Sequence, residues 1–205
     1  MRLTLTEFLT LDGVVQGPGM PEEDTSGGFT RGGWSFPYAD EDFGRLMTGW
    51  FEEADAFLLG RRTYDIFAAH WPRVTDPADP IATKLNALPK YVASRTLRTA
   101  EWRNTTILSD DVPARVAELK KRPGREIGIS GSAELARSLL AEGLIDEVRL
   151  LFHPVVLGGG KKLFAEGIAP LALRLTRVET TASGIVLHVY EPAGAPEYGS
   201  FPAPE

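Results

Sequence analysis

Three segments of the sequence have the composition of a phosphate-binding corner, in which glycine, hydroxyl and arginine residues follow a predicted strand. A glycine or another small residue lets the backbone approach a phosphate closely, and the N–H groups of a first helical turn can hold the anion. An arginine at such a corner can pair with a phosphate through two parallel hydrogen bonds. The three segments are Gly60–Arg61–Arg62–Thr63, Ser94–Arg95 and Ser130–Gly131–Ser132–Ala133.

Each corner also has a purely structural interpretation. Gly60 could form a tight turn beside two surface arginines, and Arg95 could be an ordinary solvated side chain. Ser132 could cap the helix that follows it. The third corner does not match G-x-G-x-x-G, so the sequence does not support a Rossmann-type cofactor site. Residue types and spacing therefore leave phosphate binding and turn formation both open.

A run of three glycines and two acidic segments are the other candidates for chemistry. Gly158–Gly159–Gly160 loses much conformational entropy on folding, which either a close backbone approach to a flat ligand or a wide turn would explain. A buried acid near a substrate can donate a proton in general acid catalysis, and Asp12, Asp40 and Asp42 are the carboxyl candidates. Turn formation by Asp12 and helix capping by Asp40 are the structural alternatives.

Several function classes are excluded by what the sequence lacks. It contains no cysteine, which excludes disulfides, thiolate catalysis and cysteine-ligated zinc. The three histidines, His70, His153 and His188, have no metal-ligand spacing, and we expect them to be structural or exposed. The sequence has no G-x-S-x-G, Walker A or H-E-x-x-H motif, so nothing indicates a hydrolase or a metalloenzyme.

Composition indicates one soluble domain of 205 residues, with 43% hydrophobic and 24% charged residues. A net charge of −6 disfavours general nucleic-acid binding. No apolar run approaches the roughly 18 residues of a membrane helix. The N-terminal segment alternates polar and apolar residues and contains Glu7, which is not typical of a signal peptide. We therefore expect a cytoplasmic protein without a membrane or nucleic-acid partner.

The elements that must position these residues alternate between strand and helix. Hydrophobic periodicity predicts strands over 2–11, 56–59, 91–93, 105–108, 126–129, 147–157, 171–178 and 185–190, and helices over 40–53, 61–71, 113–121 and 133–142. This order predicts an α/β fold with a mostly parallel sheet, flanking helices and a C-terminal antiparallel hairpin. Ligands bind such sheets beyond the carboxyl ends of the strands, where the three corners lie.

Two segments fall outside this pattern. Residues 12–38 are rich in glycine and poor in aliphatic residues, and a connection of this length is usually functional or disordered. Residues 192–205 are rich in proline and glycine, and we expect this tail to be disordered.

Taken together, the segments resemble the dihydrofolate reductase superfamily, and most closely the C-terminal reductase domain of the bifunctional deaminase-reductases of riboflavin biosynthesis. The resemblance covers residues 1–191. It is carried by LDGVV at 11–15, LLGRRTYD at 58–65, VASRTL at 92–97 and SGSAELARSLLAEGLIDEVRLLFHPVVLGGGKKLF at 130–164.

The resemblance implies NADPH bound across the strand ends. Arg61 and Arg62, with Ser94 and Arg95, would face the 2′-phosphate and the adjoining phosphates. The turn of Gly131, Ser132 and Ala133 would pass over the diphosphate, with Thr63 capping its helix against it. The implied cofactor site also includes Gly60, Ser130, Gly158 and Gly159.

On the substrate side, Trp34 to Asp40 looks like the tryptophan-to-acid stretch of true dihydrofolate reductases. Asp40 would then hold the substrate ring, with Asp42 as the second candidate, although the insertion at 17–33 departs from the family pattern. The zinc deaminase domain of the bifunctional enzymes has no counterpart in this cysteine-free chain.

The resemblance thus implies a stand-alone NADPH-dependent reductase of a pyrimidine- or pterin-like heterocycle. The known activities that it suggests are reduction of 5-amino-6-(5-phosphoribosylamino)uracil and reduction of dihydrofolate. The alternative is a domain that binds NADPH to sense or sequester it, with little catalysis. By the same resemblance we expect a homodimer, with the C-terminal hairpin as a candidate interface.

Overall fold

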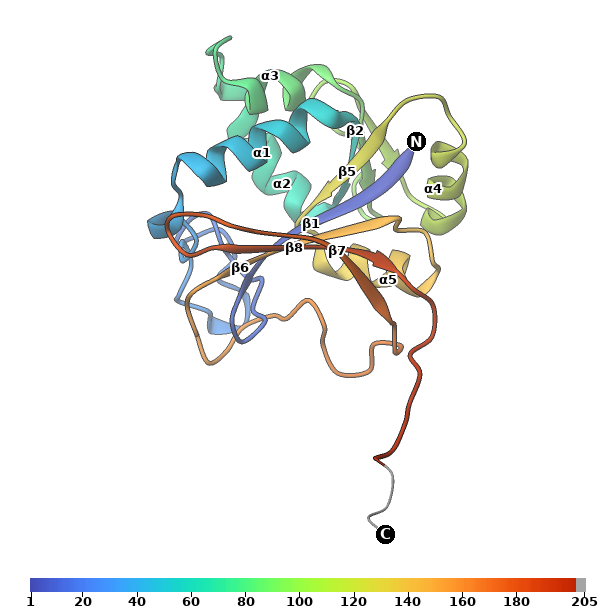
Figure 1. The fold of residues 1–205 in the computed structure, drawn as a ribbon. Helices are drawn as coiled ribbons and strands as arrows, with labels where there is room; N and C mark the ends of the chain where they lie inside the picture. The colour runs from blue at the N-terminus through green and yellow to red at the C-terminus, as the bar shows by residue number, and fades with distance from the viewer. Residues whose placement is uncertain (202–205) are drawn as a thin grey trace.

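The computed structural model describes residues 1–201, and its centre is one eight-stranded sheet (Figure 1). The strand order is β4-β3-β2-β5-β1-β6-β8-β7. The strands are β1 (Arg2–Thr10), β2 (Ala54–Gly60), β3 (Lys90–Ala93), β4 (Thr105–Leu108), β5 (Glu126–Ser130), β6 (Glu147–His153), β7 (Leu173–Thr180) and β8 (Val186–Pro192). In the part of this order that runs β4-β3-β2-β5-β1-β6, neighbouring strands are parallel. Strand β8 is antiparallel to both of its neighbours, β6 and β7. The predicted fold class is confirmed.

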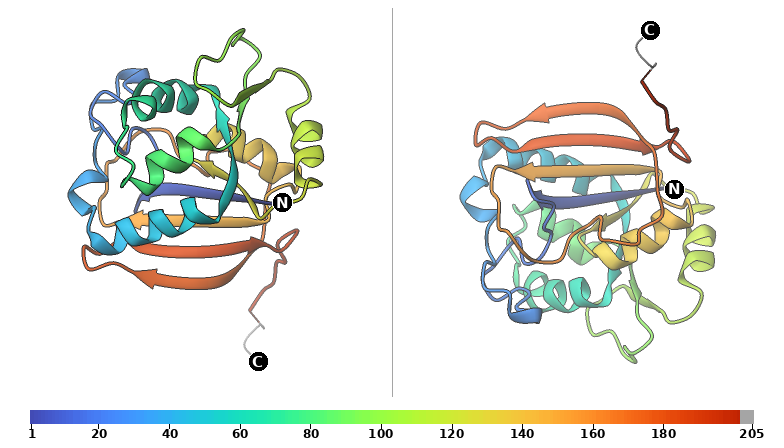
Figure 2. Two further views of the ribbon diagram at one scale, coloured as in Figure 1. Left: turned by 90° about the horizontal axis from the view of Figure 1, so that it is seen from above. Right: turned by 90° about the horizontal axis from the view of Figure 1, so that it is seen from below.

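Helices cover both faces of this sheet (Figure 2). The α-helices are α1 (Glu41–Glu53), α2 (Arg61–His70), α3 (Pro80–Ala87), α4 (Val112–Lys120) and α5 (Ala133–Ala141). Leu3 and Leu5 of β1 share one buried cluster with side chains of α4 and α5. A second cluster joins α1, α2 and α3 to β2, through residues such as Met47 and Phe57. Within the described residues, no helix is both long and apolar enough to cross a membrane.

Strand β1 lies in the middle of the sheet, between β5 and β6. Its side chains alternate between the two faces, as in any strand. Leu3, Leu5 and Leu9 are at most 1% exposed, and Glu7 occupies the same face of the strand. A carboxyl group therefore stands where the alternation calls for a leucine.

The structure corrects the predicted end of one strand and adds one helix. Strand β6 ends at His153 rather than at residue 157, because the chain turns away at Pro154. Helix α3 was not predicted, although Asp79 supplies the N-cap, accepting a hydrogen bond of 2.9 Å from the Ala82 N–H. Its first residue is Pro80, the position at which a helix tolerates proline best.

The glycine-rich segment 12–38 is folded against the body of the protein. It contains two 3₁₀ helices, η1 (Ser26–Gly28) and η2 (Phe36–Tyr38). The buried Gln16 amide donates to the carbonyl oxygens of Asp24 and Ser26, and the Trp34 indole donates to the Gln16 carbonyl over 2.8 Å. These contacts hold the segment together internally, and hydrogen bonds from the Lys161 N–H to Gln16 Oε1 and from the Val15 N–H to the Lys161 carbonyl join it to the chain that follows β6.

The tail begins one residue later than predicted, since β8 extends through Pro192. Residues 193–201 contain no helix or strand, and the Ala193 N–H donates to the Ala172 carbonyl over 2.8 Å. Residues 202–205, also predicted to be disordered, lie outside the described part of the chain.

Candidate functional site

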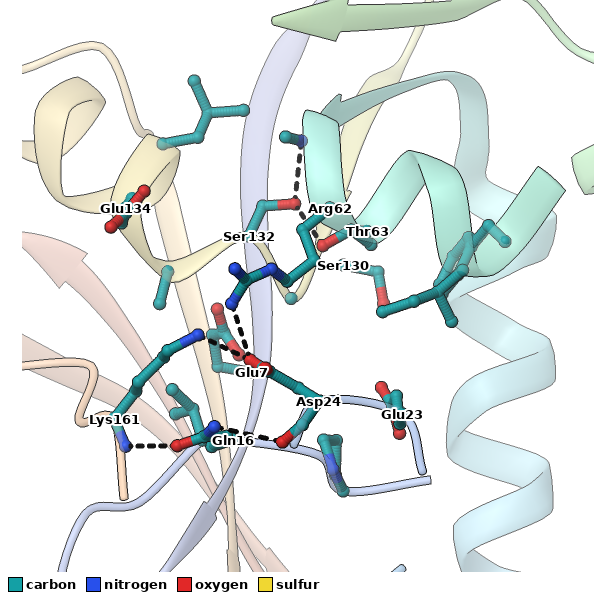
Figure 3. A pocket seen from close by; sticks show the side chains of 18 of the residues that line it. Glu7, Gln16, Glu23, Asp24, Arg62, Thr63, Ser130, Ser132, Glu134 and Lys161 are labelled. Carbon is teal, nitrogen blue, oxygen red and sulfur yellow. Dashed lines mark hydrogen bonds and ion pairs between the residues drawn. The ribbon is translucent and has the colours of Figure 1, made fainter. Parts of the chain in front are cut away.

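All three predicted corners line one cavity of about 1530 Å³ at the carboxyl ends of the parallel strands. Figure 3 shows Arg62 and Thr63 of the first corner and Ser130 and Ser132 of the third. Its volume exceeds the roughly 300–1,000 Å³ of a usual small-ligand pocket, which leaves room for a dinucleotide and a second molecule. The predicted residues that line it are Gly60, Arg61, Arg62, Thr63, Ser94, Arg95, Ser130, Gly131, Ser132 and Ala133. The structure thus brings together corners that begin at residues 60 and 130, which are 70 positions apart in the sequence.

The first and third corners are joined directly by Ser132. Its Oγ accepts a hydrogen bond of 2.9 Å from the Gly60 N–H and donates one of 3.0 Å to Thr63 Oγ1. A Cβ on Gly60 would approach Ser132 to 3.3 Å, so the absence of a side chain permits this close contact. Ser132 does not cap its own helix, which excludes the structural alternative considered for this residue.

The third corner has an unusual backbone. Gly131 and Ser132 both have left-handed conformations, with φ of 63° and 67°. Glycine adopts this conformation freely, whereas serine does so at a cost in free energy. Consecutive residues of this kind at the start of a helix can leave N–H groups turned toward an anion.

The second corner leaves a cationic side chain available. Ser94 Oγ accepts hydrogen bonds from the N–H groups of Thr96 and Leu97, which fixes the turn after β3. Arg95 is exposed at the cavity and forms no ion pair within residues 1–201.

The two arginines of the first corner are already paired. Arg61 Nε lies 2.8 Å from an Asp65 oxygen, and Arg62 Nη1 lies 2.9 Å from Asp24 Oδ2. Lys161 Nζ reaches the same Asp24 oxygen over 2.6 Å. Burial alone would raise the pKa of Asp24, but hydrogen bonds from Lys161 and Ser26 hold it well below its usual value. Asp24 is therefore a carboxylate that ties segment 12–38 to the cavity rim (Figure 3).

Glu7 is the buried acid of this cavity, and the sequence analysis did not identify it as a site residue. It lines the cavity, yet it is only 4% exposed. Burial raises its pKa to about 8, although the positive charge of Arg137 acts in the opposite direction. The interruption of the Leu3–Leu5–Leu9 alternation by a carboxylic acid was the signal that could have found it.

The wall toward α1 and α2 is apolar. It consists of Phe8, Phe43, Met47, Phe51, Ile66, Phe67, Trp71 and Ile81. Flat aromatic side chains of this kind provide a surface on which a planar ring can stack.

Two predicted cofactor residues do not line the cavity. Gly158 and Gly159 lie in a turn that Asp12 holds by accepting hydrogen bonds from the Leu157 and Gly158 N–H groups, with 2.8 Å between Gly158 N and Asp12 Oδ2. The Thr10 hydroxyl and the Leu157 and Gly158 N–H groups lower the pKa of Asp12 to about 2. The third glycine, Gly160, does line the cavity.

The two carboxylates predicted to be catalytic are also outside the cavity lining. Asp40 caps α1, accepting 2.8 Å from the Phe43 N–H, and it also accepts 2.7 Å from the Ser183 N–H. Asp42 pairs with Arg45 at 2.8 Å. The structure thus places both acids in contacts between α1 and the 181–183 turn, and it does not bring them to the candidate site.

Comparison with known proteins shows the family to which this chain belongs. The model of the RibD C-terminal domain matches residues 2–187, most of the chain. The chain belongs to the RibD C-terminal domain family. The resemblance inferred from the sequence motifs is thereby confirmed.

Relatives in sequence and in structure align over nearly the whole chain. YyaP of Bacillus subtilis (strain 168) is 31% identical over 191 residues, which cover 92% of this chain and 94% of YyaP. A crystal structure of a Shewanella sp. PV-4 protein has a TM-score of 0.67 at 20% identity, covering 94% of this chain and 99% of that one.

The fold also matches part of a larger enzyme that is named as both a deaminase and a reductase. The diaminohydroxyphosphoribosylaminopyrimidine deaminase/5-amino-6-(5-phosphoribosylamino)uracil reductase of Thermotoga maritima has a TM-score of 0.61 at 13% identity. The match covers 94% of this chain but only 56% of that enzyme. At this identity the likeness establishes the fold alone.

Proposed function

We propose that this RibD C-terminal domain protein is an NADPH-dependent reductase of a pyrimidine- or pterin-like heterocycle. The observation that carries the proposal is the convergence of three strand-end corners on one cavity that also has an aromatic wall. The corners suit the phosphates of a dinucleotide, and the aromatic wall suits a planar ring.

The residues present fit the cofactor. The left-handed pair Gly131–Ser132 precedes α5, where backbone N–H groups and the helix dipole favour a diphosphate. Arg95 is available for the 2′-phosphate, with Arg61 beside it once released from its exposed pair with Asp65. Arg62 has a different role in the proposal, because Asp24 neutralises it and the rim depends on that pair.

These positions indicate which part of the reaction the cofactor would perform and which part the residues of the chain would perform. NADPH, when bound, supplies the hydride for a C=N or carbonyl carbon. The chain binds and orients the two reactants, and segment 12–38 with the aromatic wall excludes water from them. The reductase activity in the name of the Thermotoga maritima enzyme belongs to the same reaction class and supports the proposal.

Titration of the purified protein with NADPH and, separately, with NADH tests this proposal. We expect a clear preference for NADPH, measured by calorimetry or nicotinamide fluorescence. Arg95→Ala should weaken NADPH binding about tenfold or more and leave NADH nearly unchanged, since only NADPH carries the 2′-phosphate. Arg115→Ala, on the exposed surface of α4, is the matched control. Equal losses for both cofactors would exclude a contact between Arg95 and the 2′-phosphate.

A binding role without turnover is the second candidate. It is favoured by the position of Asp40 and Asp42, which are absent from the cavity lining. Oxidation of NADPH in the presence of any member of a panel of pyrimidines and pterins would count against it.

A further inference from the structure

Glu7 has the position of a ligand-binding group without a partner in the protein. Its side chain lines the cavity on the face of β1 that also carries Leu5 and Leu9. Oε1 is fully buried and has no hydrogen-bond partner within residues 1–201. No hydrogen bond to Oε2 is formed there either. A buried polar atom is almost always hydrogen-bonded, so an unpartnered one at a cavity needs an explanation.

The surroundings of Glu7 keep its carboxyl group neutral. Burial of an isolated carboxylate costs far more free energy than burial of the protonated acid. The pKa of Glu7 is accordingly raised to about 8, with burial as the main cause. At neutral pH the group therefore carries its proton and offers one O–H donor and one carbonyl acceptor.

Other charges around the cavity do not provide Glu7 with a counter-ion. Arg137 of α5 acts on it electrostatically, but its Nη1 donates to the carbonyl oxygens of Lys162 and Leu163. Arg62 of α2 and Lys161 are both bound to Asp24 of segment 12–38 (Figure 3).

The charge of the matching ligand group follows from this arrangement. The field of Arg137 disfavours a second cation at Glu7. An anion would confront a carboxyl group that can itself become negative. The ligand group that is complementary to the neutral Glu7 carboxyl group is therefore uncharged and has a hydrogen-bond acceptor next to a donor.

We propose that Glu7 recognises an amide edge of the bound ligand, donating its O–H to the carbonyl oxygen and accepting a hydrogen bond from the adjacent N–H. This inference rests on the proposed function for the choice of ligands. Two ligand sources carry this edge: the carboxamide of the nicotinamide ring, and the cyclic amide of a uracil-type substrate.

Binding measurements on three proteins test the proposal: wild type, Glu7→Gln and Glu7→Leu. Glutamine keeps one donor and one acceptor at nearly the same positions and cannot ionise, whereas leucine removes both and matches the apolar neighbours. Glu118→Leu, on the exposed surface of α4, controls for loss of a carboxylate elsewhere. Denaturant unfolding of each protein establishes that it is folded before ligand is added.

The first set of titrations uses NADPH and its reduced 3-acetylpyridine analogue, which keeps the carbonyl but lacks the amide N–H. If the cofactor is the source, Glu7→Leu weakens NADPH binding about 10- to 100-fold at pH 6 and no longer distinguishes the analogue. Wild-type affinity then falls as the pH rises through about 8, where Glu7 loses its proton, and Glu7→Gln affinity does not.

The second set uses uracil and 2,4-dimethoxypyrimidine, which lacks every cyclic amide edge. If the substrate is the source, Glu7→Leu leaves NADPH affinity unchanged but loses the preference for uracil. Affinities for NADPH and uracil that are both independent of Glu7 overturn the proposal, as does wild-type binding that strengthens above pH 8. Failure of wild type to bind either NADPH or NADH refutes the proposed function instead, and the uracil titrations then decide the role of Glu7.

Discussion

The Oγ of Ser132 lies 2.9 Å from the backbone nitrogen of Gly60, a residue 72 positions away in the sequence. This one hydrogen bond connects the end of β2 to the start of α5. It sets the spacing between two of the corners that line the cavity.

Two substitutions of Ser132 should distinguish the effect of its hydrogen bond on stability from the effect of its left-handed backbone conformation. Ser132→Ala removes the acceptor of the Gly60 N–H and keeps the left-handed φ of 67°. We expect a loss of about 1–3 kcal/mol in the free energy of unfolding. Ser132→Gly also loses the hydrogen bond but relieves the strain of the left-handed residue, which is worth about 1 kcal/mol. Urea unfolding should therefore rank wild type above Ser132→Gly, and Ser132→Gly above Ser132→Ala.

The reverse order of the two variants would contradict this account, because it would mean that the left-handed conformation at this position costs no more for alanine than for glycine. Ser138→Ala is a useful control on the same helix. Its hydroxyl donates only to the Leu135 carbonyl, one turn back, so its loss should change stability little.

The two ion pairs of Asp24 should contribute to the stability of the protein and to the protection of segment 12–38 from proteolysis. The Asp24 side chain is 12% exposed, whereas Arg62 and Lys161 are 58% and 46% exposed. Solvent screening reduces the value of such pairs, so Asp24→Ala should lower the free energy of unfolding by only about 1–2 kcal/mol. We expect a larger effect on limited proteolysis, with faster cleavage inside 17–33. Glu22→Ala, exposed two residues away, should be cleaved at the wild-type rate.

The glycine run 158–160 contains one position that has no room for a side chain. A Cβ on Gly160 would lie 2.6 Å from Val14 Cγ1, and its φ is 132°. Gly160→Ala should therefore destabilise the protein by about 2–4 kcal/mol. Gly159 has nothing within 4 Å of a Cβ, so Gly159→Ala should unfold at nearly the wild-type temperature. Equal melting temperatures for the two variants would show that Val14 and Phe29 yield to the added methyl group.

Local patterns predicted most of the fold because its elements obey local rules. The parallel strands are apolar runs that end in small residues, and the helices between them have amphipathic spacing. Helix α3 was missed although Asp79 and Pro80 are a standard start signal, since its eight residues carry a weak apolar pattern. The end of β6 was misplaced because the apolar residues after Pro154 resemble a continuing strand.

The candidate site was only partly predictable, because its composition depends on which chain segments meet. Residue types identified the corners at 60–63, 94–95 and 130–133, and parallel strands necessarily bring such ends to one edge. The positions of the acids relative to the cavity could not be predicted for the same reason. Asp40 satisfies a helix end in the structure, whereas Glu7 is a buried cavity group because residues of α5 and of segment 12–38 line the same cavity at the end of β1. Burial of this kind comes from tertiary packing, which no local pattern contains.

The expected homodimer has a specific candidate interface in β7. This strand lies at the end of the sheet order and exposes Leu175 and Val178 by 49% and 52%. We expect sedimentation velocity at micromolar concentration to give twice the chain mass of 22.4 kDa. Val178→Lys should shift the boundary to the monomer, because a charge would be buried in the interface. A single wild-type boundary at the monomer mass would refute the homodimer.

The raised pKa of Glu7 predicts a measurable pH dependence of stability. In the unfolded chain the group titrates near 4.5, whereas in the folded protein it holds its proton up to about pH 8. The folded state thus binds more protons in this window, and the free energy of unfolding decreases as the pH rises from 4.5 to 8, by at most about 1.4 kcal/mol per pH unit. Glu7→Gln carries no titrating proton, so it should lack this component. The difference in unfolding free energy between Glu7→Gln and wild type should therefore grow with pH and level off above pH 8. A difference that is constant from pH 4 to 9 would show that Glu7 is ionised in the folded protein.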